Sequence, residues 1–218
     1  MEKVRVFLTD WQVLFRAGVH LTLAAEKSYQ IIGEAATNEQ ALDFIERHKP
    51  EVAILNADRG ELTGIEITRR VRQNLPSVAV ILMMDSYGDE QVFTALKSGA
   101  SACLSKDVKP DDLLDTVRKV VQGEYPISQN ILQPAVAARI INEFESLLRL
   151  KEKSANLPAC PSSLEAQILE RIANGASLEE IVHCLSITED IIRQRLYIIL
   201  GKLVSNERNY QQNDLTIA

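Results

Sequence analysis

The sequence predicts an α/β chain in two parts, a five-stranded parallel sheet with helices on both faces and then a long helix with a small all-helical domain. Two observations support this prediction. Through the first 124 residues, short apolar runs alternate with longer segments whose apolar residues recur at helical spacing. After Gly123 the strand-like runs stop and only helical patterns follow. Strands that alternate with helices form a parallel sheet that is covered on both faces.

Each predicted strand is a short apolar run. The five runs are residues 4–8 (VRVFL), 29–33 (YQIIG), 52–55 (VAIL), 78–82 (VAVIL) and 101–104 (SACL). The segments between them, such as EQALDFIERHK and DEQVFTALKSGA, have helical spacing. Ligands of such sheets bind beyond the carboxyl ends of the strands. Asp10, Asn56, Met84 and Lys106 follow four of these ends, so we expect them to lie close together.

The fifth helix of the sheet domain, KPDDLLDTVRKVVQG, is expected to end at Gly123. Beyond two prolines, AVAARIINEFESLLRLKEK reads as one long amphipathic helix, and SANLPACPSS reads as a linker. The apolar stripe of that helix suits a dimer contact between residues 135 and 150 and equally suits packing against the sheet domain of the same chain.

The segment after this linker is predicted to be a small all-helical domain. SLEAQILERIANG ends at Gly175, SLEEIVHCL begins with the capping box of Ser177 and Glu180, and TEDIIRQRLYIILGKL is capped by Thr188. The tight turn SIT between the last two makes a helix-turn-helix. The polar stretch from Asn206 is expected to be loose. The predicted boundaries are 1–124, 125–160 with the long helix, 161–205, and a tail at 206–218.

Composition excludes several classes of protein. Hydrophobic residues make up 46% of the 218 and charged residues 25%, which is typical of a globular chain that buries a sizeable core. No apolar run reaches the length of a membrane span and the first residues do not resemble a signal peptide, so we expect a cytoplasmic protein without a membrane partner. The net charge of −6 gives no whole-chain attraction to nucleic acid.

The chain resembles the NarL/FixJ family of response regulators, which join a flavodoxin-like receiver domain to a LuxR-type helix-turn-helix. VRVFLTD, IIGEAATNEQAL, GIEITRRVRQNLP, FTALKSGASACLSKD and DDLLDTVRKVVQGE match the receiver pattern. LERIANGASLEEI and ITEDIIRQRLYIILGKL match the output domain. The resemblance covers the chain up to about residue 203.

Receivers of this family accept a phosphoryl group on an aspartate, with help from Mg²⁺, a hydroxyl and a lysine. The matching positions here are Asp10, Trp11, Asn56, Met84, Cys103 and Lys106. Tryptophan replaces the second metal-binding acid, asparagine the acceptor, methionine the hydroxyl and cysteine the aromatic residue that responds to phosphate. An amide is not the nucleophile this chemistry needs. We therefore expect a degenerate pseudo-receiver, with no metal, no cofactor and no enzyme activity.

Two alternatives to a receiver without any input chemistry remain. Asp58 lies on the same side of the strand as Asn56 and is a substitute acceptor, with Ser86 as a substitute hydroxyl. Redox chemistry at Cys103 or Cys160 is another possible input, although no basic neighbour in the sequence is seen to lower the pKa of either thiol.

The positions that match the family's DNA contacts are Arg193, Gln194, Arg195, Tyr197 and Lys202. Arginine and glutamine suit guanine and adenine edges in the major groove. Against DNA binding stands the charge from residue 155 to residue 218, five Lys and Arg against eight Asp and Glu. Asp190 lies beside the expected contacts, and Val204 replaces the family's glycine.

Two functions follow from the resemblance. The first is a DNA-binding transcription regulator that works without phosphorylation, acting as a homodimer through the receiver's fourth and fifth helices or through the long helix. The alternative is an adaptor whose helix-turn-helix has lost DNA and binds another regulator or RNA polymerase.

Overall fold

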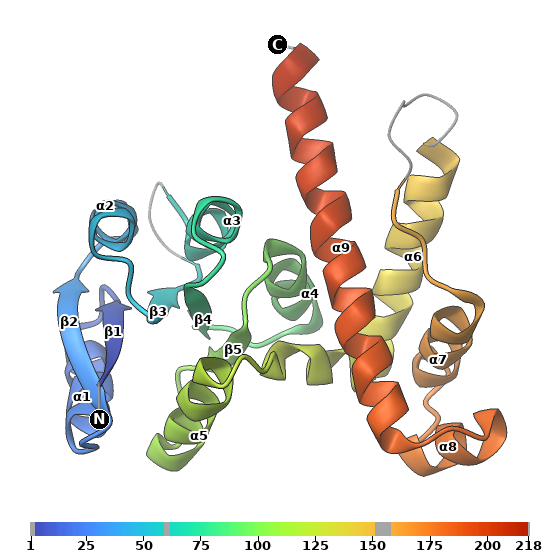
Figure 1. Cartoon of the computed structure of the whole chain (residues 1–218), viewed down its shortest axis with the longest axis horizontal. Helices are drawn as coiled ribbons and strands as arrows, with labels where there is room; N and C mark the ends of the chain where they lie inside the picture. The colour runs from blue at the N-terminus through green and yellow to red at the C-terminus, as the bar shows by residue number, and fades with distance from the viewer. Residues whose placement is uncertain (1–2, 59–61, 151–157, 218) are drawn as a thin grey trace. The chain divides into compact units, whose positions relative to one another are not determined.

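The computed structural model describes residues 3–58, 62–150 and 158–217 (Figure 1). They fall into two compact units. One comprises Met1–Gln91 with Ser98–Ile127, and the other comprises Val92–Lys97 with Ser128–Ala218.

The first unit is built on a five-stranded, all-parallel sheet with strand order β2-β1-β3-β4-β5. Its strands are β1 (Val4–Thr9), β2 (Tyr29–Ala35), β3 (Val52–Asn56), β4 (Ala79–Met84) and β5 (Ala102–Ser105). Every predicted strand is present, with ends within two residues of the predicted ones. Residues of β3 are buried throughout, because both faces of the central strand are covered.

Helices connect the strands. They are α1 (Val13–Ala24), α2 (Asn38–His48), α3 (Gly64–Asn74), α4 (Asp89–Ser98) and α5 (Pro110–Val121). Of α4, residues Val92–Lys97 group with the second unit. Helices α1 and α5 pack on one face of the sheet through Val19, Leu23, Leu113 and Val117, and α2 and α3 lie on the opposite face (Figure 1). The doubly wound α/β fold predicted from the sequence is confirmed.

Helix α3 approaches the end of β3 very closely. Thr63 caps it in a reciprocal capping box with Glu66. A Cβ on Gly64, the first helical residue, would lie 2.1 Å from the carbonyl oxygen of Asn56. Glycine is therefore required at this position for the helix to begin beside Asn56.

The second unit is helical apart from its loops. A 3-10 helix, η1 (Pro126–Leu132), leads to α6 (Pro134–Leu150), α7 (Ser163–Ala173), α8 (Leu178–Leu185) and α9 (Glu189–Ile217). The capping box of Ser177 and Glu180 is present, and Gly175 follows α7 with φ +81°. Of the predicted linker, residues 151–157 lie outside the described residues. No helix in the described ranges is long and apolar enough to cross a membrane.

The apolar stripe of α6 is buried within the chain. Val136, Ala137, Ile140 and Phe144 have exposed fractions of 4% or less. Helix α6 also packs closely against α7. The stripe is therefore covered by other residues of the chain.

The polar tail predicted from Asn206 onward is not loose, and that prediction was wrong. Helix α9 continues through it to Ile217. Valine stands at position 204, where a glycine could adopt the left-handed conformation that ends a helix, and no glycine or proline follows. The side chain of Asn206 also anchors the helix, because its amide accepts from the N–H of Ala159 at 2.7 Å and donates to the carbonyl of Ala159 at 3.0 Å.

Candidate functional site

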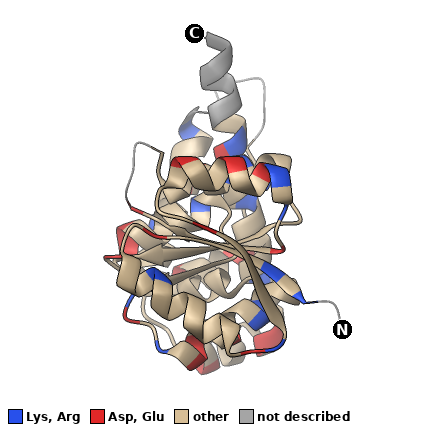
Figure 2. Ribbon diagram, turned by 90° about the vertical axis from the view of Figure 1, so that its left-hand side faces the viewer, with Lys and Arg blue, Asp and Glu red and all other residues tan. Residues whose placement is uncertain are grey.

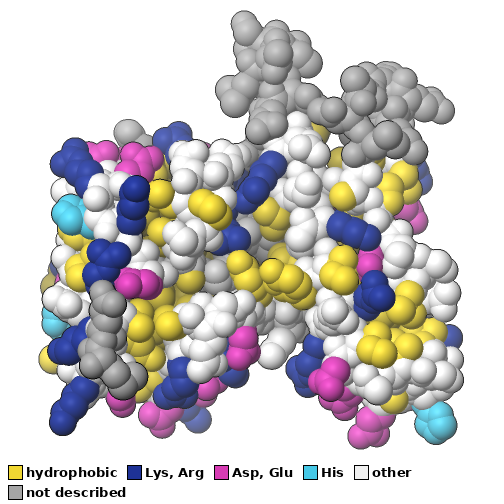
Figure 3. Space-filling model, viewed as in Figure 1, with side chains coloured by type: hydrophobic (Ala, Val, Ile, Leu, Met, Phe, Trp, Pro, Cys, Tyr) yellow, Lys and Arg dark blue, Asp and Glu magenta, His cyan; other side chains and the backbone are white. Residues whose placement is uncertain are grey.

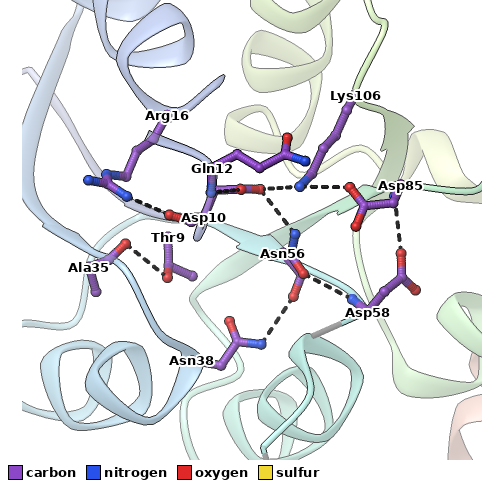
Figure 4. A network of polar contacts seen from close by, with 10 residues as sticks. All are labelled: Thr9, Asp10, Gln12, Arg16, Ala35, Asn38, Asn56, Asp58, Asp85 and Lys106. Atoms are coloured by element: carbon purple, nitrogen blue, oxygen red, sulfur yellow. Dashed lines mark hydrogen bonds and ion pairs between the residues drawn. The ribbon is translucent and has the colours of Figure 1, made fainter. Parts of the chain in front are cut away.

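A polar network lies at the carboxyl ends of β1, β3 and β5 (Figure 4). The Nζ of Lys106 lies 2.7 Å from Oδ2 of Asp10. The side-chain amide of Asn56 donates to the same oxygen at 3.1 Å. The parallel sheet thus brings together Asp10, Asn56 and Lys106, which are far apart in the sequence, and Lys106 pairs with Asp10 as its sequence position suggested.

The carboxylate of Asp10 is buried and fully engaged within the chain. Its residue is 1% exposed. Oδ1 accepts from the backbone N–H of Gln12 at 2.7 Å, while Oδ2 receives Asn56 and Lys106. Arg16 donates to its backbone carbonyl at 2.5 Å. A buried charge that is paired and hydrogen-bonded in this way does not depend on a ligand for its stability.

Sequence reasoning missed a second acid in the network. Asp85 directly follows β4, and one of its carboxylate oxygens lies 2.9 Å from Nζ of Lys106. Its backbone N–H donates to Oδ2 of Asp58 at 3.1 Å, and the N–H of Asp58 donates to Oδ1 of Asn56 at 3.1 Å (Figure 4). The signal was available, because an acid directly after a strand end faces the same edge as Asp10 and Asn56.

Aromatic rings complete the surroundings of Lys106. Its Nζ lies 5.8 Å from the ring centroid of Trp11 and 5.2 Å from that of Phe15. Ring faces at this distance attract an ammonium group. Trp11 itself is 44% exposed, so the indole lies at the rim of the network and covers Lys106 from outside.

The two remaining predicted positions are buried and carry no phosphate-binding group. Met84 is 1% exposed and its carbonyl accepts from the N–H of Lys106 at 3.1 Å. The Sγ of Cys103 lies 3.6 Å from the hydroxyl of Tyr87. Burial raises the pKa of the Cys103 thiol to about 11, against a smaller lowering by that hydroxyl. A thiol that stays protonated is a poor redox sensor, so the burial of Cys103 disfavours the redox chemistry suggested for it from the sequence.

In the second unit, helices α8 and α9 form the predicted helix-turn-helix. Ser186 makes the turn with φ 53°, and the Thr188 hydroxyl accepts from the N–H of Ile191 at 3.4 Å at the start of α9. Three of the five predicted DNA-contact residues, Arg193, Gln194 and Tyr197, are exposed on the outer face of α9. Arg193 lies 3.5 Å from Glu189 on the same helix.

The other two predicted contacts turn inward. Arg195 and Lys202 lie 3.5 Å and 2.6 Å from the two carboxylate oxygens of Glu165, which is 1% exposed. Burial alone would raise the pKa of Glu165, but hydrogen bonds from Lys202 and from the Ser162 cap outweigh it, and this pKa lies below its ordinary value. Sequence reasoning missed Glu165, although Ser162 and Glu165 have capping-box spacing.

Charges of both signs are mixed over the surface. Basic and acidic segments are interspersed on the helices seen in Figure 2. Dark-blue and magenta side chains also lie next to one another in Figure 3, where the described atoms of the face in view form no continuous basic surface. The described part of this face therefore offers no broad basic surface to a nucleic acid.

Comparison with known proteins places the chain in a family. Residues 6–118 match the model of the response regulator receiver domain. The chain belongs to the response regulator receiver family. The matched range contains β2 to β5, all of β1 except its first two residues, and all the residues of the network around Lys106.

The relatives of this response regulator extend beyond the receiver. It is 31% identical over 205 residues to the transcriptional regulatory protein YhcZ of Bacillus subtilis, covering 94% of this chain and 92% of that protein. It is 28% identical to the transcriptional regulatory protein DegU of Brevibacillus brevis over 94% and 90% of the two chains. The signal receiver domain of NarL from Mycobacterium tuberculosis is 31% identical, with a TM-score of 0.55 over 57% of this chain and 100% of that one.

Receivers imply a magnesium ion, and the residues of this response regulator do not fit one. Mg²⁺ takes an octahedron of oxygen ligands. Here the ammonium group of Lys106 and the amide N–H of Asn56 already occupy Oδ2 of Asp10, and Trp11 stands where the second acid would follow. Within the described ranges, no group of three or more His, Cys, Asp or Glu residues is arranged to hold a metal.

Proposed function

We propose that this response regulator is a transcription regulator that binds DNA through α8 and α9 and works without phosphorylation. The position of Lys106 between Asp10 and Asp85 carries the proposal for the receiver. The names of its relatives and the exposed face of α9 support the proposal for DNA binding.

Phosphoryl transfer to a receiver needs two things from the pocket residues. The acceptor must be nucleophilic, and developing negative charge must be neutralised by a cation. An amide at position 56 does not supply the first. Lys106, the one cation in Figure 4 close to the acceptor position, is held by two carboxylates and two aromatic rings, and so is already neutralised.

The outer face of α9 carries side chains that suit DNA bases. Arg193 and Gln194 are both exposed there, and their side chains suit guanine and adenine edges. Tyr197 follows one turn later and is 50% exposed. In a helix-turn-helix, this face of the second helix enters the major groove.

The receiver is tested by titrating the full chain with beryllofluoride and Mg²⁺ while following the emission of Trp11, its only tryptophan. We expect no change. The variant Lys106→Met serves as a positive control, because it removes the ammonium group 5.8 Å from the indole and must alter the emission. A saturable response at millimolar Mg²⁺ would sink phosphorylation independence. Mass spectrometry after acetyl phosphate treatment decides separately on Asp58, where a hydroxylamine-labile phosphoryl adduct would contradict the proposal.

DNA binding is tested by incubating the full chain with random duplex DNA, sequencing the retained fraction and repeating the selection across a salt series. We expect an enriched motif whose affinity falls steeply with salt. Arg193→Ala should abolish the enrichment, whereas Arg171→Ala, which removes the same charge from α7, should preserve it.

The adaptor is a second candidate, and one observation favours it. Three predicted DNA-contact cations, Arg193, Arg195 and Lys202, all lie within 3.5 Å of an acid in the structure. No enriched motif and no measurable affinity at about 50 mM salt would select this function. Binding to purified RNA polymerase or to a second response regulator then becomes the measurement that defines it.

A homodimer stays part of the proposal. Val136, Ala137, Ile140 and Phe144 of α6 are buried within the chain, which favours the face of α4 and α5 as the dimer contact. Sedimentation equilibrium of the full chain measures it, and a monomer mass at micromolar concentration contradicts it.

A further inference from the structure

Two of the basic side chains on α9 share one buried partner. Arg195 and Lys202 are seven residues apart, which places them on the same side of the helix two turns apart. Nη1 of Arg195 lies 3.5 Å from Oε1 of Glu165, and Nζ of Lys202 lies 2.6 Å from Oε2. Each oxygen of the carboxylate therefore meets one cation.

Glu165 also closes the amino-terminal end of α7. Its Oε2 accepts from the backbone N–H of Ser162 at 2.9 Å, and its own N–H donates to the Ser162 hydroxyl at 3.3 Å. One buried carboxylate thus joins the first turn of α7 to the second and fourth turns of α9. A buried carboxylate is costly unless it is paired and hydrogen-bonded.

If a DNA phosphate bound either cation, Glu165 would lose that cation as a partner and its burial would become unfavourable. Lys202 is 24% exposed and Arg195 36%, against 2% for the side chain of Glu165. If either cation moved to a phosphate, Glu165 would remain buried with half of its charge pairing lost. Arg193, in contrast, is paired only with the exposed Glu189, which is a weak interaction that DNA can replace.

We propose that Glu165, Arg195 and Lys202 form a charge cluster that sets the orientation of α9 on α7, so that Arg195 and Lys202 are positioning residues and do not contact DNA. Readout then falls to Arg193, Gln194 and Tyr197 on the opposite face of the helix. The part that concerns DNA rests on the proposed function, and the part that concerns the cluster does not.

The test compares three neutralising variants of the full chain, Arg195→Gln, Lys202→Gln and Arg193→Gln. Two quantities are measured for each, namely the hydrogen-exchange rates of α7 and α9 amides and the slope of log affinity against log salt on random duplex DNA. We expect Arg195→Gln and Lys202→Gln to exchange faster with an unchanged salt slope. The control Arg193→Gln should exchange as the wild type does and lose about one unit of slope, the value for one phosphate contact.

Each outcome decides. A slope lowered by about one unit in Arg195→Gln or Lys202→Gln overturns the proposal, whatever the exchange rates are. Unchanged exchange in both variants also overturns it. Lys202→Arg keeps the positive charge and should show slow exchange like the wild type. If Glu165→Gln and Lys202→Gln each accelerate exchange, the double variant that carries both changes should show less than the sum of their effects. If the wild type binds no DNA, the proposed function fails, while the exchange measurements still decide on the cluster.

Discussion

At the scale of single residues, Lys106 is the most consequential side chain of the receiver. It is 11% exposed and lies against the fully buried carboxylate of Asp10. Removing one partner of a buried pair leaves the other as an uncompensated charge. We expect Lys106→Met to lower the free energy of unfolding by about 3–5 kcal/mol, measured by urea titration of the full chain.

A matched control comes from the surface. Lys119 pairs with Asp115 on the same helix and is 39% exposed, so Lys119→Met should change stability by less than about 1 kcal/mol. In the double variant Asp10→Asn with Lys106→Met the buried charge is gone, and part of the lost stability should return. If Lys106→Met were as stable as Lys119→Met, the ion pair could not be what holds this pocket together.

The cysteines should differ sharply in reactivity. Cys103 is buried and the pKa of its thiol is raised to about 11, whereas Cys184 is exposed. Since the thiolate is the reactive form, brief treatment with iodoacetamide at neutral pH should modify Cys184 and leave Cys103 intact. Peptide mass spectrometry measures this, and denatured protein, in which every cysteine reacts, is the control. Early modification of Cys103 in the native chain would reinstate it as a sensor.

At the scale of elements, two glycines of the receiver should respond in opposite ways to alanine. At Gly64 a Cβ would lie 2.1 Å from the carbonyl oxygen of Asn56, so Gly64→Ala must push α3 away and should cost about 1–3 kcal/mol. At Gly18, inside α1, a Cβ meets nothing within 4 Å. Gly18→Ala should therefore stabilise by about 0.5–1 kcal/mol. Urea titrations of the two variants give both values, and equal effects would contradict this reading of the α3 contact.

Element ends could be predicted where a side chain makes the cap. Ser177, Glu180 and Gly175 were identified because capping boxes and glycine stops have short sequence spacings. The length of α9 could not be predicted, because the polar composition after Asn206 suggested a loose tail. What maintains the helix there is the absence of a breaker at Val204 and a contact with Ala159, which is distant in the sequence.

At the scale of the whole molecule, each unit has its own buried core. We expect low pH to destabilise the helical unit through protonation of Glu165. The pKa of Glu165 in the folded chain lies below its ordinary value. The contribution of Glu165 to the free energy of unfolding is therefore fully present above about pH 4.3 and is lost as the pH falls through the folded pKa. Hydrogen exchange of α7 and α9 should therefore accelerate on acidification, once corrected for intrinsic rates. Glu165→Gln should flatten this dependence, and an equally steep dependence in that variant would assign the effect to other carboxyls.

The receiver pocket could be anticipated further than the output surface. Strand ends of a parallel sheet meet at one edge, so Asp10, Asn56 and Lys106 were expected to converge, and they do. On α9, the sequence positions of Arg195 and Lys202 suggested DNA contacts. The direction of a long basic side chain on a helix depends on the acid that it pairs with. For Arg195 and Lys202 that acid is Glu165, which lies on another helix.

The network around Asn56 also limits what evolution can do with this receiver. Asn56→Asp alone would set a second carboxylate 3.1 Å from that of Asp10, with Lys106 already shared with Asp85. Trp11 and Met84 would still deny the metal and the phosphoryl oxygens their ligands. A change at position 56 alone would therefore crowd two carboxylates without supplying the other groups that hold a phosphoryl group, so several substitutions would have to occur together.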